Sequence, residues 1–422
     1  MTRSQLFFYS LLALPLAFVE LPLFVNLPKF YAEEGMNLAI IGYVLLVVRS
    51  LDALKDPILG YAADYFYKGP ASRFFMIGLF APLLALGFYL LWNPPEEGTS
   101  LIFWFALTLF CVHFADSAMI IAYYSLGAEM APDYHERTRV TSFRESFRIV
   151  GLLMAAVIPT ILVNRWGREE GFSQFSLLFI AVLLGAYLLF LKSKPKTSPT
   201  RYVRECIKWQ DLKSALQDKD FLWIAGLHML NVFAFSCPTA LFAFVASDIV
   251  CEPQQEGFFL MSYFVSGILG MMLWTTISKK WGKKKALLAS LYLSVFIFAF
   301  AIFLKPHMIL PFYGICFLAG LSFGADLALP PSILADVIAE QTHLSKPPSG
   351  IYFGVWNITA KFSTALAPGL IFPFLSHMGY EKGITSPDSL FYLLACFTLL
   401  PAGLKLATAI LLQLSPLEKR NL

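Results

Sequence analysis

Charged residues are scarce in this sequence, and its cysteines form no motif. Of the 422 residues, 14% are charged and 58% are hydrophobic, whereas ordinary soluble domains carry roughly 25% charged residues. No two of the six cysteines form a CxxC pair, so we expect neither a disulfide framework nor a metal site. The net charge of +4 is too small to indicate nucleic-acid binding. Because the shortage of charge extends along the whole chain, we predict a polytopic membrane protein.

Long apolar stretches follow one another along the chain. A membrane-spanning helix needs about 20 mostly apolar residues. The first stretch, 6–27, is longer than the apolar part of a typical cleavable signal peptide, so we expect it to be the first span. We therefore predict an all-α polytopic membrane protein with 12 transmembrane helices. The predicted spans are 6–27, 38–66, 74–92, 101–130, 140–163, 175–191, 221–244, 257–277, 286–304, 310–338, 351–374 and 389–414.

The longest polar segment divides these spans into two groups of six. Residues 192–220 begin as a Lys/Pro/Ser/Thr linker and end in a predicted short amphipathic helix on the membrane surface. The loops after the second and eighth spans, GYAADYFYKGPASR and TTISKKWGKKK, are both short and basic and form a weak repeat. We predict a six-helix bundle over 1–191, a cytoplasmic connector over 192–220 and a second six-helix bundle over 221–422. This is the plan of major facilitator carriers.

The distribution of lysine and arginine predicts the orientation in the membrane. With the N-terminus inside, the cytoplasmic segments carry 21 of the 32 basic residues, the outer loops carry 5, and the remaining 6 lie within predicted spans. Cytoplasmic loops are enriched in Lys and Arg. We therefore expect a multi-pass protein of the cell inner (plasma) membrane with both termini in the cytoplasm.

The second predicted span contains the stretch RSLDALKDPILGYAAD, residues 49–64. A charged side chain at the bilayer centre costs at least about 2.5–3.5 kcal/mol on insertion scales, so it persists only beside a partner or a water-filled cavity. Positions 49, 52, 56, 60 and 64 share one helix face. The charged side chains of this stretch are Arg49, Asp52, Lys55, Asp56 and Asp64.

Asp52 and Asp56 are the candidate ion site of this span. Arg49 can pair with Asp52 three residues further on, and the helical rise places Asp56 near the midplane. Pro57 removes one backbone donor beside Asp56. Two midplane carboxylates one turn apart favour a cation or proton site. The alternative is a structural ion-pair stripe that packs two helices together.

Three segments resemble one carrier family. VVRS followed by DALKDPILGYAAD resembles the helix-two signature of the glycoside–pentoside–hexuronide (GPH):cation symporters, the melibiose-permease-like carriers of the major facilitator superfamily. Residues 124–147 are similar to the family's turn between spans four and five, and ADVIAE followed by GVWNITAKFSTALA is similar to its spans ten and eleven. The resemblance implies a secondary transporter in which Asp52 and Asp56 bind the coupling Na⁺, Li⁺ or H⁺. It also places Arg144 at the inner end of span five and Lys361 inside span eleven.

The chain departs from this family where sugar and cation bind. The family's span-one aspartate is missing, with Glu20 about one turn away, and its span-four aspartate falls near Ile120. We therefore do not expect a galactoside site. Lys55 stands where the family's type member has an uncharged polar residue, and a fixed ammonium beside two carboxylates repels a second cation. Proton exchange among Asp52, Asp56 and Lys55 is favoured over dedicated Na⁺ binding.

Other polar residues in the spans are weaker candidates. Arg144 and Arg148, four residues apart, form either a cytoplasmic ion-pair lock or a site for an anionic substrate. Lys361 lies near the midplane, and we expect it to belong to the coupling site with Asp52 or Asp56 as its partner. The predicted charge and gating network consists of Arg49, Asp64, Arg144, Arg148 and Asp336. The candidates for the substrate cavity are Glu20, His113, Asp116, Tyr123, Tyr124, His228, Asn231, Trp356 and Asn357; helix packing is the alternative for His113, Asp116, His228, Asn231 and Trp356.

The predicted function is secondary active transport of a small solute by alternating access, coupled to H⁺ or Na⁺. We expect no enzymatic activity, no cofactor apart from the coupling ion, no nucleic-acid partner, and a monomer in the lipid bilayer. The loss of both sugar carboxylates leaves a lysolipid, siderophore or organic-anion carrier open as an alternative. A receptor-like protein that has lost transport is a further alternative.

Overall fold

The computed structural model describes residues 3–66, 70–95, 100–130, 134–193, 213, 215–341, 349–380 and 386–415. Every regular element within these ranges is a helix. The prediction of an all-α protein is therefore confirmed. The amphipathic helix predicted before residue 220 falls mostly on residues 194–212, which lie outside the described ranges, as does Cys206.

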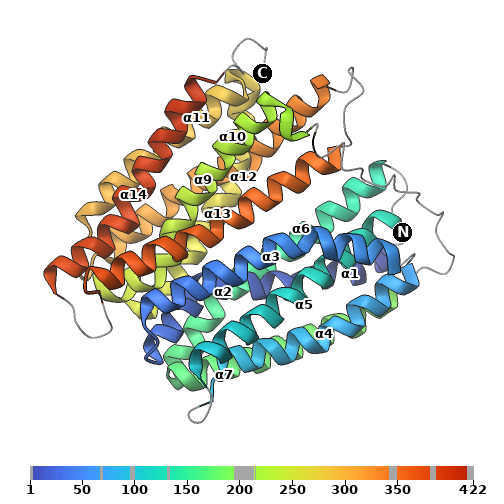
Figure 1. Cartoon of the computed structure of the whole chain (residues 1–422), viewed down its shortest axis with the longest axis horizontal. Coiled ribbons are helices and arrows are strands. Elements are labelled where there is room, and N and C mark those ends of the chain that lie inside the picture. The colour runs from blue at the N-terminus through green and yellow to red at the C-terminus, as the bar shows by residue number, and fades with distance from the viewer. Residues whose placement is uncertain are drawn as a thin grey trace. The chain divides into compact units, whose positions relative to one another are not determined.

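The helices before the connector follow one another with only a few residues between them (Figure 1). The first predicted span is two helices, α1 and α2, with Leu12 between them. Pro15 explains this break, because it has no N–H to donate to the carbonyl of Leu11. The bounds are α1 Arg3–Leu11, α2 Ala13–Glu33, α3 Leu38–Phe66, α4 Pro70–Trp92, α5 Leu101–Met130, α6 Tyr134–Trp166, α7 Arg168–Phe190 and the 3₁₀ turn η1 Leu191–Ser193.

The helices after the connector include one π-helical segment, η2, which continues α9 without a break. Asp218 caps the start of α9, because its side chain accepts hydrogen bonds from the backbone N–H groups of Asp220 and Phe221. The bounds are α9 Lys219–Phe244, η2 Val245–Ile249, η3 Pro253–Gln255, α10 Glu256–Trp281, α11 Lys283–Phe300, η4 Ala301–Phe303, α12 Ile309–Gln341, α13 Ser349–His377 and α14 Pro387–Gln413.

Eleven stretches among the described helices are long and apolar enough to cross a membrane, and α1 with α2 is one of them. The remaining long helix, α3, has 29 residues. At 1.5 Å per residue it is about 44 Å long, which is enough to span. Its five charged residues make it too polar to be recognised as a membrane span from composition alone. With α3 the helices correspond to the twelve predicted spans, and most extend a few residues beyond the predicted ends.

The chain forms two compact units. The first contains the described residues of Met1–Leu27 and Val47–Arg204, and the second those of Pro28–Leu46 and Glu205–Leu422. The end of α2 and the start of α3 therefore belong to the second unit. Glycines allow close packing there: a Cβ at Gly42 would lie 2.8 Å from the carbonyl oxygen of Pro368, and one at Gly369 would lie 2.7 Å from Cβ of Leu46.

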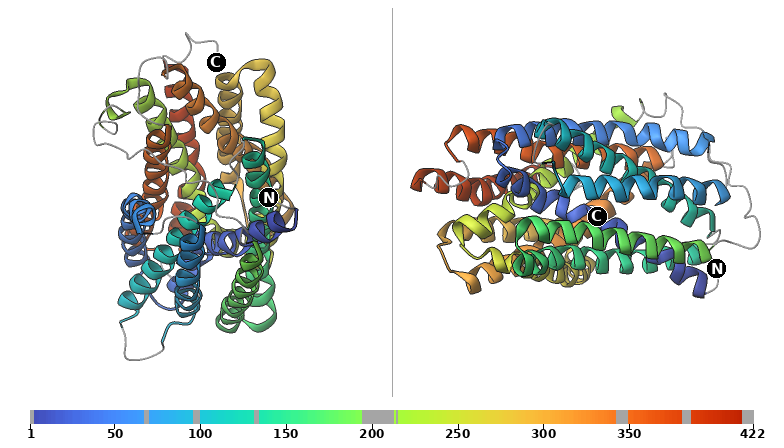
Figure 2. Two further views of the ribbon diagram at one scale, coloured as in Figure 1. Left: turned by 90° about the vertical axis from the view of Figure 1, so that its right-hand side faces the viewer. Right: turned by 90° about the horizontal axis from the view of Figure 1, so that it is seen from below.

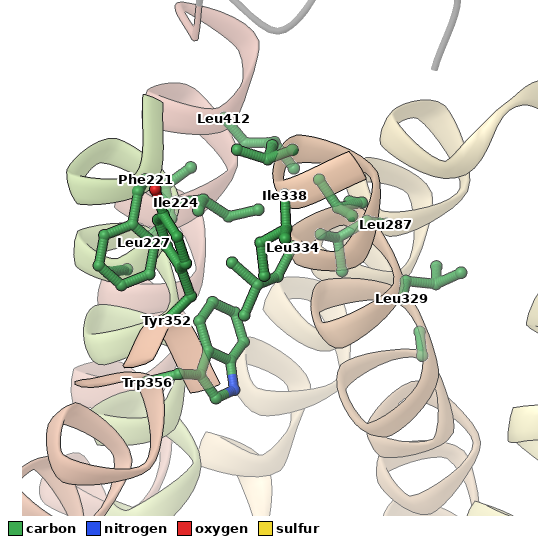
Figure 3. Packing of buried hydrophobic residues seen from close by; sticks show 14 of the residues in the cluster. Phe221, Ile224, Leu227, Leu287, Leu329, Leu334, Ile338, Tyr352, Trp356 and Leu412 are labelled. Atoms are coloured by element: carbon green, nitrogen blue, oxygen red, sulfur yellow. The ribbon is translucent and has the colours of Figure 1, made fainter. Parts of the chain in front are cut away.

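Each unit is a bundle of helices packed side by side. In the first unit α4 and α5 run alongside one another (Figures 1 and 2). The core of the second unit includes Trp356 and Tyr352 of α13, which face Leu334 of α12 (Figure 3). The ring of Tyr352 meets Phe221 of α9 edge-on, with 4.8 Å between the ring centroids. These apolar cores hold the polar groups of the spans in fixed positions.

Candidate functional site

Lys55 is the centre of a charged cluster on α3, in the first unit. Its Nζ donates a short hydrogen bond to Oδ1 of Asp52, one turn earlier on the same helix. The same Nζ lies 3.6 Å from Oδ1 of Asp56. The side chain of Asp52 is 9% exposed and that of Asp56 is 28% exposed. The structure therefore brings together three of the four residues predicted to form the coupling site, all but Lys361, and Asp56 is the more accessible carboxylate.

Helix α5 supplies the other ligands of this ammonium. Lys55 Nζ donates to the backbone carbonyl of His113 and to Oγ of Ser117, both at 3.0 Å. Ser117 in turn donates to Oδ1 of Asp52 at 3.2 Å. An ammonium has three N–H donors, and Asp52, His113 and Ser117 account for three acceptors. Asp56 is therefore held by charge attraction rather than by a direct hydrogen bond from Lys55.

Arg49 anchors the cluster toward α2. Its Nη2 donates to the carbonyl oxygen of Leu23 at 2.9 Å, and its guanidinium lies 3.8 Å from the ring centroid of Phe24. Arg49 also interacts electrostatically with Asp52. The spacing in the sequence predicts Arg49 as the partner of Asp52, and in the structure Lys55 and Ser117 also donate hydrogen bonds to Asp52. Asp64 lies in the last turn of α3, and its side chain is outside the described part of the structure.

A second charged cluster lies in the first half of α6, also in the first unit. Arg148 Nη2 donates to Oε2 of Glu20 on α2 at 3.0 Å. Glu145 lies between the two arginines: its Oε2 is 3.6 Å from Nη1 of Arg148, and its Oε1 accepts from Nε and Nη2 of Arg144 at 3.1 and 2.8 Å. The side chains of Arg148 and Glu20 are 45% and 49% exposed. This cluster combines two guanidiniums and two carboxylates, and all but Arg144 are substantially exposed.

Tyrosines form one side of this α6 cluster. The guanidinium of Arg144 lies 3.8 Å from the ring centroid of Tyr124 on α5, a cation–π contact. Next to it, Tyr9 and Tyr123 stack at 4.6 Å, and each hydroxyl donates to the backbone carbonyl of the other at 3.0 Å. Tyr123 is buried and ties α1 to α5. Tyr124 is exposed and is the tyrosine available to a solute.

His113 and Asp116, predicted for the cavity, lie half-buried on α5. His113 takes part in the α3 cluster through its backbone carbonyl. Within the described residues, no group of His, Cys, Asp or Glu side chains is placed to hold a metal ion. The candidate residues of the first unit therefore divide into the α3 cluster and the α6 cluster.

In the second unit, Asn231 belongs to a buried network. Lys405 Nζ on α14 donates to Oδ2 of Asp326 on α12 at 2.5 Å and to Oδ1 of Asn231 on α9 at 2.8 Å. Asn231 Nδ2 donates to Oδ1 of Asp326 at 2.9 Å, which closes the triangle. The sequence predicts no functional role for Asp326 or Lys405. Lys405 is the lone charge of its predicted span, Asp326 shares its span with Asp336, and no motif marks Asp326 or Lys405.

The other predicted residues of the second unit lie on α9, α12 and α13. His228 stacks face to face on Trp356, with 3.6 Å between ring centroids. Asp336 forms a short ion pair with Lys283 at the start of α11. Asn357 is exposed and Lys361 half-buried. Lys361 belongs to the second unit and Asp52 and Asp56 to the first, so the predicted pairing between them stays a prediction.

Long apolar helices with charged groups held inside them define a polytopic membrane transporter, and solved structures share the fold. A mutant of the nucleoside transporter NupG aligns with a TM-score of 0.70 at 16% identity, over 97% of this chain and 98% of that one. A structure described under "substrate recognition in proton dependent oligopeptide transporters" aligns with a TM-score of 0.72 at 13% identity, over 99% and 100% of the two chains.

Sequence comparison identifies the family. The chain belongs to the MFS_2 family, described as "MFS/sugar transport protein", which it matches over residues 8–419. It is 21% identical to the sodium-dependent lysophosphatidylcholine symporter 1 of Gallus gallus, over 90% of this chain and 79% of the relative. It is 22% identical to the sphingosine-1-phosphate transporter MFSD2B of Xenopus tropicalis, over 81% and 73%. It is 23% identical to the inner membrane symporter YicJ of Escherichia coli (strain K12), over 90% and 85%. The chain is thus an integral, multi-pass membrane transporter of the major facilitator superfamily and not an enzyme.

Proposed function

We propose that this transporter moves a single-chain amphiphile with a phosphate-bearing, zwitterionic headgroup, and that protons rather than Na⁺ drive it. The α6 cluster recognises the headgroup, and the α3 cluster couples transport to the proton gradient. The observation that carries the proposal is the position of Lys55, whose ammonium is bound between the carboxylates of Asp52 and Asp56.

The coupling argument rests on charge. Two carboxylates one turn apart attract a cation, and in this chain that cation is covalently attached. A free Na⁺ entering the cluster would meet the ammonium of Lys55 within a few ångströms, and like charges at such distances repel strongly where solvent screening is weak. A proton faces a smaller obstacle, because it binds to a carboxylate oxygen and neutralises it. Asp56 is the acceptor in this proposal, because it is more exposed and Lys55 donates no hydrogen bond to it.

The substrate argument rests on the composition of the α6 cluster. Guanidiniums bind phosphate through paired N–H donors, and an aromatic face together with carboxylates suits a quaternary or primary amine. Arg148, Glu20 and Tyr124 offer these groups on exposed surface. The same helix exposes the apolar side chains of Phe143 and Val150. A headgroup of both charges attached to one apolar chain matches this surface.

The names of two relatives support the same chemistry. Lysophosphatidylcholine and sphingosine-1-phosphate each combine a phosphate, a cationic nitrogen and one long apolar chain. An organic anion without a tail is the second candidate, since the arginines of the α6 cluster also suit a carboxylate. Transport in this proposal proceeds by alternating access, in a monomer of the inner or plasma membrane with both termini in the cytoplasm.

Counterflow in proteoliposomes tests the substrate. The probe is radiolabelled lysophosphatidylcholine, with melibiose and glucuronate as competing solutes. We expect Arg148→Gln and Glu20→Gln to lower uptake by about tenfold or more, equivalent to ~1.4 kcal/mol of lost binding. Folding should be preserved, because an exposed ion pair contributes only about 0–1 kcal/mol to stability. The matched control is Glu252→Gln, which removes the carboxylate beside the exposed ring of His307 in the second unit and should leave uptake unchanged.

Each of two results would overturn one part of the proposal. Saturable counterflow of melibiose or glucuronate, with none of lysophosphatidylcholine, contradicts the substrate class. Accumulation driven by an imposed Na⁺ gradient at constant pH, and not by a pH gradient, contradicts the coupling ion.

A further inference from the structure

The second unit contains a buried ion pair that the proposed function does not use. Lys405 and Asp326 lie on α14 and α12, and their side chains are 3% and 10% exposed. Asn231 of α9 accepts from the ammonium and donates to the carboxylate. Asn231, Asp326 and Lys405 together form a triad. Replacing such a pair by packed apolar residues is often neutral or stabilising, so stability alone gives no reason for this one.

A small cavity lies beside the triad. Its volume is about 20 Å³, which is sufficient for one water molecule, since a water needs roughly 10–15 Å³ measured in this way. Its polar lining residues are Asn231, His228 and Thr408. Leu287 and Leu412, seen in Figure 3 among the surrounding apolar side chains, close its other sides. The cavity therefore connects the amide of the triad to an imidazole.

His228 is the titratable group at the far side of this cavity. Its ring stacks on Trp356 at 3.6 Å with 11° between the planes. Neither ring nitrogen has a hydrogen-bond partner among the residues that the structure describes. A half-buried imidazole with two unpaired nitrogens and a water-sized space beside it can take up a proton and pass it on through water.

We propose that the second unit has its own proton-binding site, in which Asp326 of the triad accepts a proton that arrives through His228 and the adjoining cavity. A proton released from a ring nitrogen of His228 enters the cavity that Asn231 also lines. Asp326, whose Oδ1 accepts a hydrogen bond from the amide of Asn231, then binds the proton on a carboxylate oxygen. Lys405 keeps its positive charge, loses its ion-pair partner and stays hydrogen-bonded to Asn231. This site is separate from the α3 cluster, which lies in the other unit.

The remaining charged or titratable groups around the site come from the neighbouring helices. Tyr263 of α10 is close enough to Asp326 to interact with it electrostatically. Helix α11 contributes the apolar side chains of Leu287 and Leu291. Helix α13 contributes Trp356, and Lys361 is the charged residue further along the same helix. Asn231, which lines the cavity with His228, is hydrogen-bonded to both Asp326 and Lys405.

The fluorescence of Trp356 reports the protonation of His228, because a protonated imidazole stacked on an indole quenches its emission. The experiment is a pH titration of the full-length protein in lipid nanodiscs, with no solute and no gradient. Subtracting the titration of Trp356→Phe from that of the wild type isolates the signal of Trp356. Because no transport is measured, the outcome is independent of the proposed substrate and of the α3 cluster.

Opposite shifts of the titration midpoint are expected from the two charge-neutral variants. Asp326→Asn leaves Lys405 unopposed and should move the midpoint of His228 to lower pH. Lys405→Gln leaves Asp326 unopposed and should move it to higher pH. Each shift should be about one pH unit, a tenfold change in proton affinity. Identical midpoints in the wild type and both variants would overturn the proposal, because His228 would then not be coupled to the triad.

A second measurement decides the matter if a single variant fails to fold. The double variant Asp326→Asn/Lys405→Gln leaves no unpaired charge. Infrared difference spectra between alkaline and acidic pH should show the C=O band of a protonated carboxyl group in the wild type, and part of that band should be missing in the double variant. Asp336→Asn, which removes a partly exposed carboxylate of the same helix, serves as the control for the buried band. An undiminished buried band in the double variant would show that Asp326 takes up no proton, and the triad would then be a static link between helices.

Discussion

Lys55 and Asp52, one helical turn apart on α3, form a direct ion pair, and the same ammonium lies 3.6 Å from Asp56. One covalently attached cation thus lies against two carboxylates inside a membrane helix. Because the hydrogen-bond donors of Lys55 are directed to Asp52, Ser117 and the carbonyl of His113, the ammonium is fixed in place. The arrangement predicts which ion the cluster accepts.

Lys55→Asn should make the protein responsive to Na⁺. The change removes the attached cation and leaves two carboxylates and the hydroxyl of Ser117, all oxygen ligands that suit a small cation. We expect NaCl to raise the thermal unfolding temperature of the variant, with choline chloride at equal ionic strength as the reference. A ligand at 100 times its Kd stabilises the folded state by about 2.7 kcal/mol. The wild type should show no such difference between the two salts.

The control for this substitution is Ser117→Ala, which keeps Lys55 and removes one of its acceptors. It should not respond to Na⁺. If the wild type is stabilised by Na⁺ as strongly as Lys55→Asn, the ammonium does not exclude the ion and the coupling argument fails.

Gly324 should be intolerant of a methyl group, because α10 and α12 approach each other closely there. A Cβ at Gly324 would lie 2.3 Å from the backbone nitrogen of Met271 and 2.5 Å from the carbonyl oxygen of Gly267. Backbone atoms cannot move aside cheaply, so Gly324→Ala should cost about 1–3 kcal/mol through overpacking. Gly314→Ala on the same helix is the control, since its Cβ would have nothing within 4 Å. Thermal unfolding in detergent should separate the two variants, and equal stability would contradict the close approach.

The sequence predicts helices well and predicts their partners poorly. Apolar runs mark the spans, because a helix that crosses the bilayer needs about 20 mostly apolar residues. Helices α3 and α5 have the predicted bounds. Some helices extend beyond their predicted ends: α6 begins at Tyr134, whereas its predicted span begins at residue 140. The reason is that polar residues outside the hydrocarbon region remain helical without a hydropathy signal.

The candidate site shows the same contrast. Asp52, Lys55 and Asp56 are close in the sequence, so helical geometry alone brings them together. The contact between Glu20 and Arg148 joins α2 to α6 and depends on how these helices pack. Hydropathy does not encode that packing. The pair of Asp326 and Lys405 spans 79 residues, and each member looks like an isolated charge in the sequence.

The orientation in the membrane remains a prediction, and two cysteines can test it. The 21 to 5 distribution of basic residues places Cys206 in the cytoplasm and Cys251 outside. Cys251 is exposed in the structure. A membrane-impermeant maleimide added to intact cells should label the wild type and the Cys206→Ala variant and fail to label Cys251→Ala. Labelling that depends on Cys206 in intact cells would reverse the assignment.

Substitution of Asp52 should lower the stability much more than substitution of Asp56, although both carboxylates belong to one cluster. Asp52 is buried and hydrogen-bonded to Lys55 and Ser117, so Asp52→Asn leaves a buried ammonium without its main partner. Breaking a buried pair in this way typically costs about 3–5 kcal/mol, and we expect a large drop in unfolding temperature. Asp56 is 28% exposed and 3.6 Å from Lys55, so Asp56→Asn should fold nearly as well as the wild type.

In transport, by contrast, we expect Asp56→Asn to impair coupling although the variant folds. Asp56 is the proposed proton acceptor, so Asp56→Asn should lose accumulation of solute driven by a pH gradient while it retains exchange without a gradient. The double variant Asp52→Asn/Lys55→Asn removes the buried pair together and should recover much of the stability lost in Asp52→Asn, which separates folding from coupling. The measurements are thermal unfolding in detergent and uptake into proteoliposomes with and without an imposed pH gradient. If Asp56→Asn still concentrates its solute against a gradient, Asp56 is not the coupling group, and the site must be sought elsewhere in the chain.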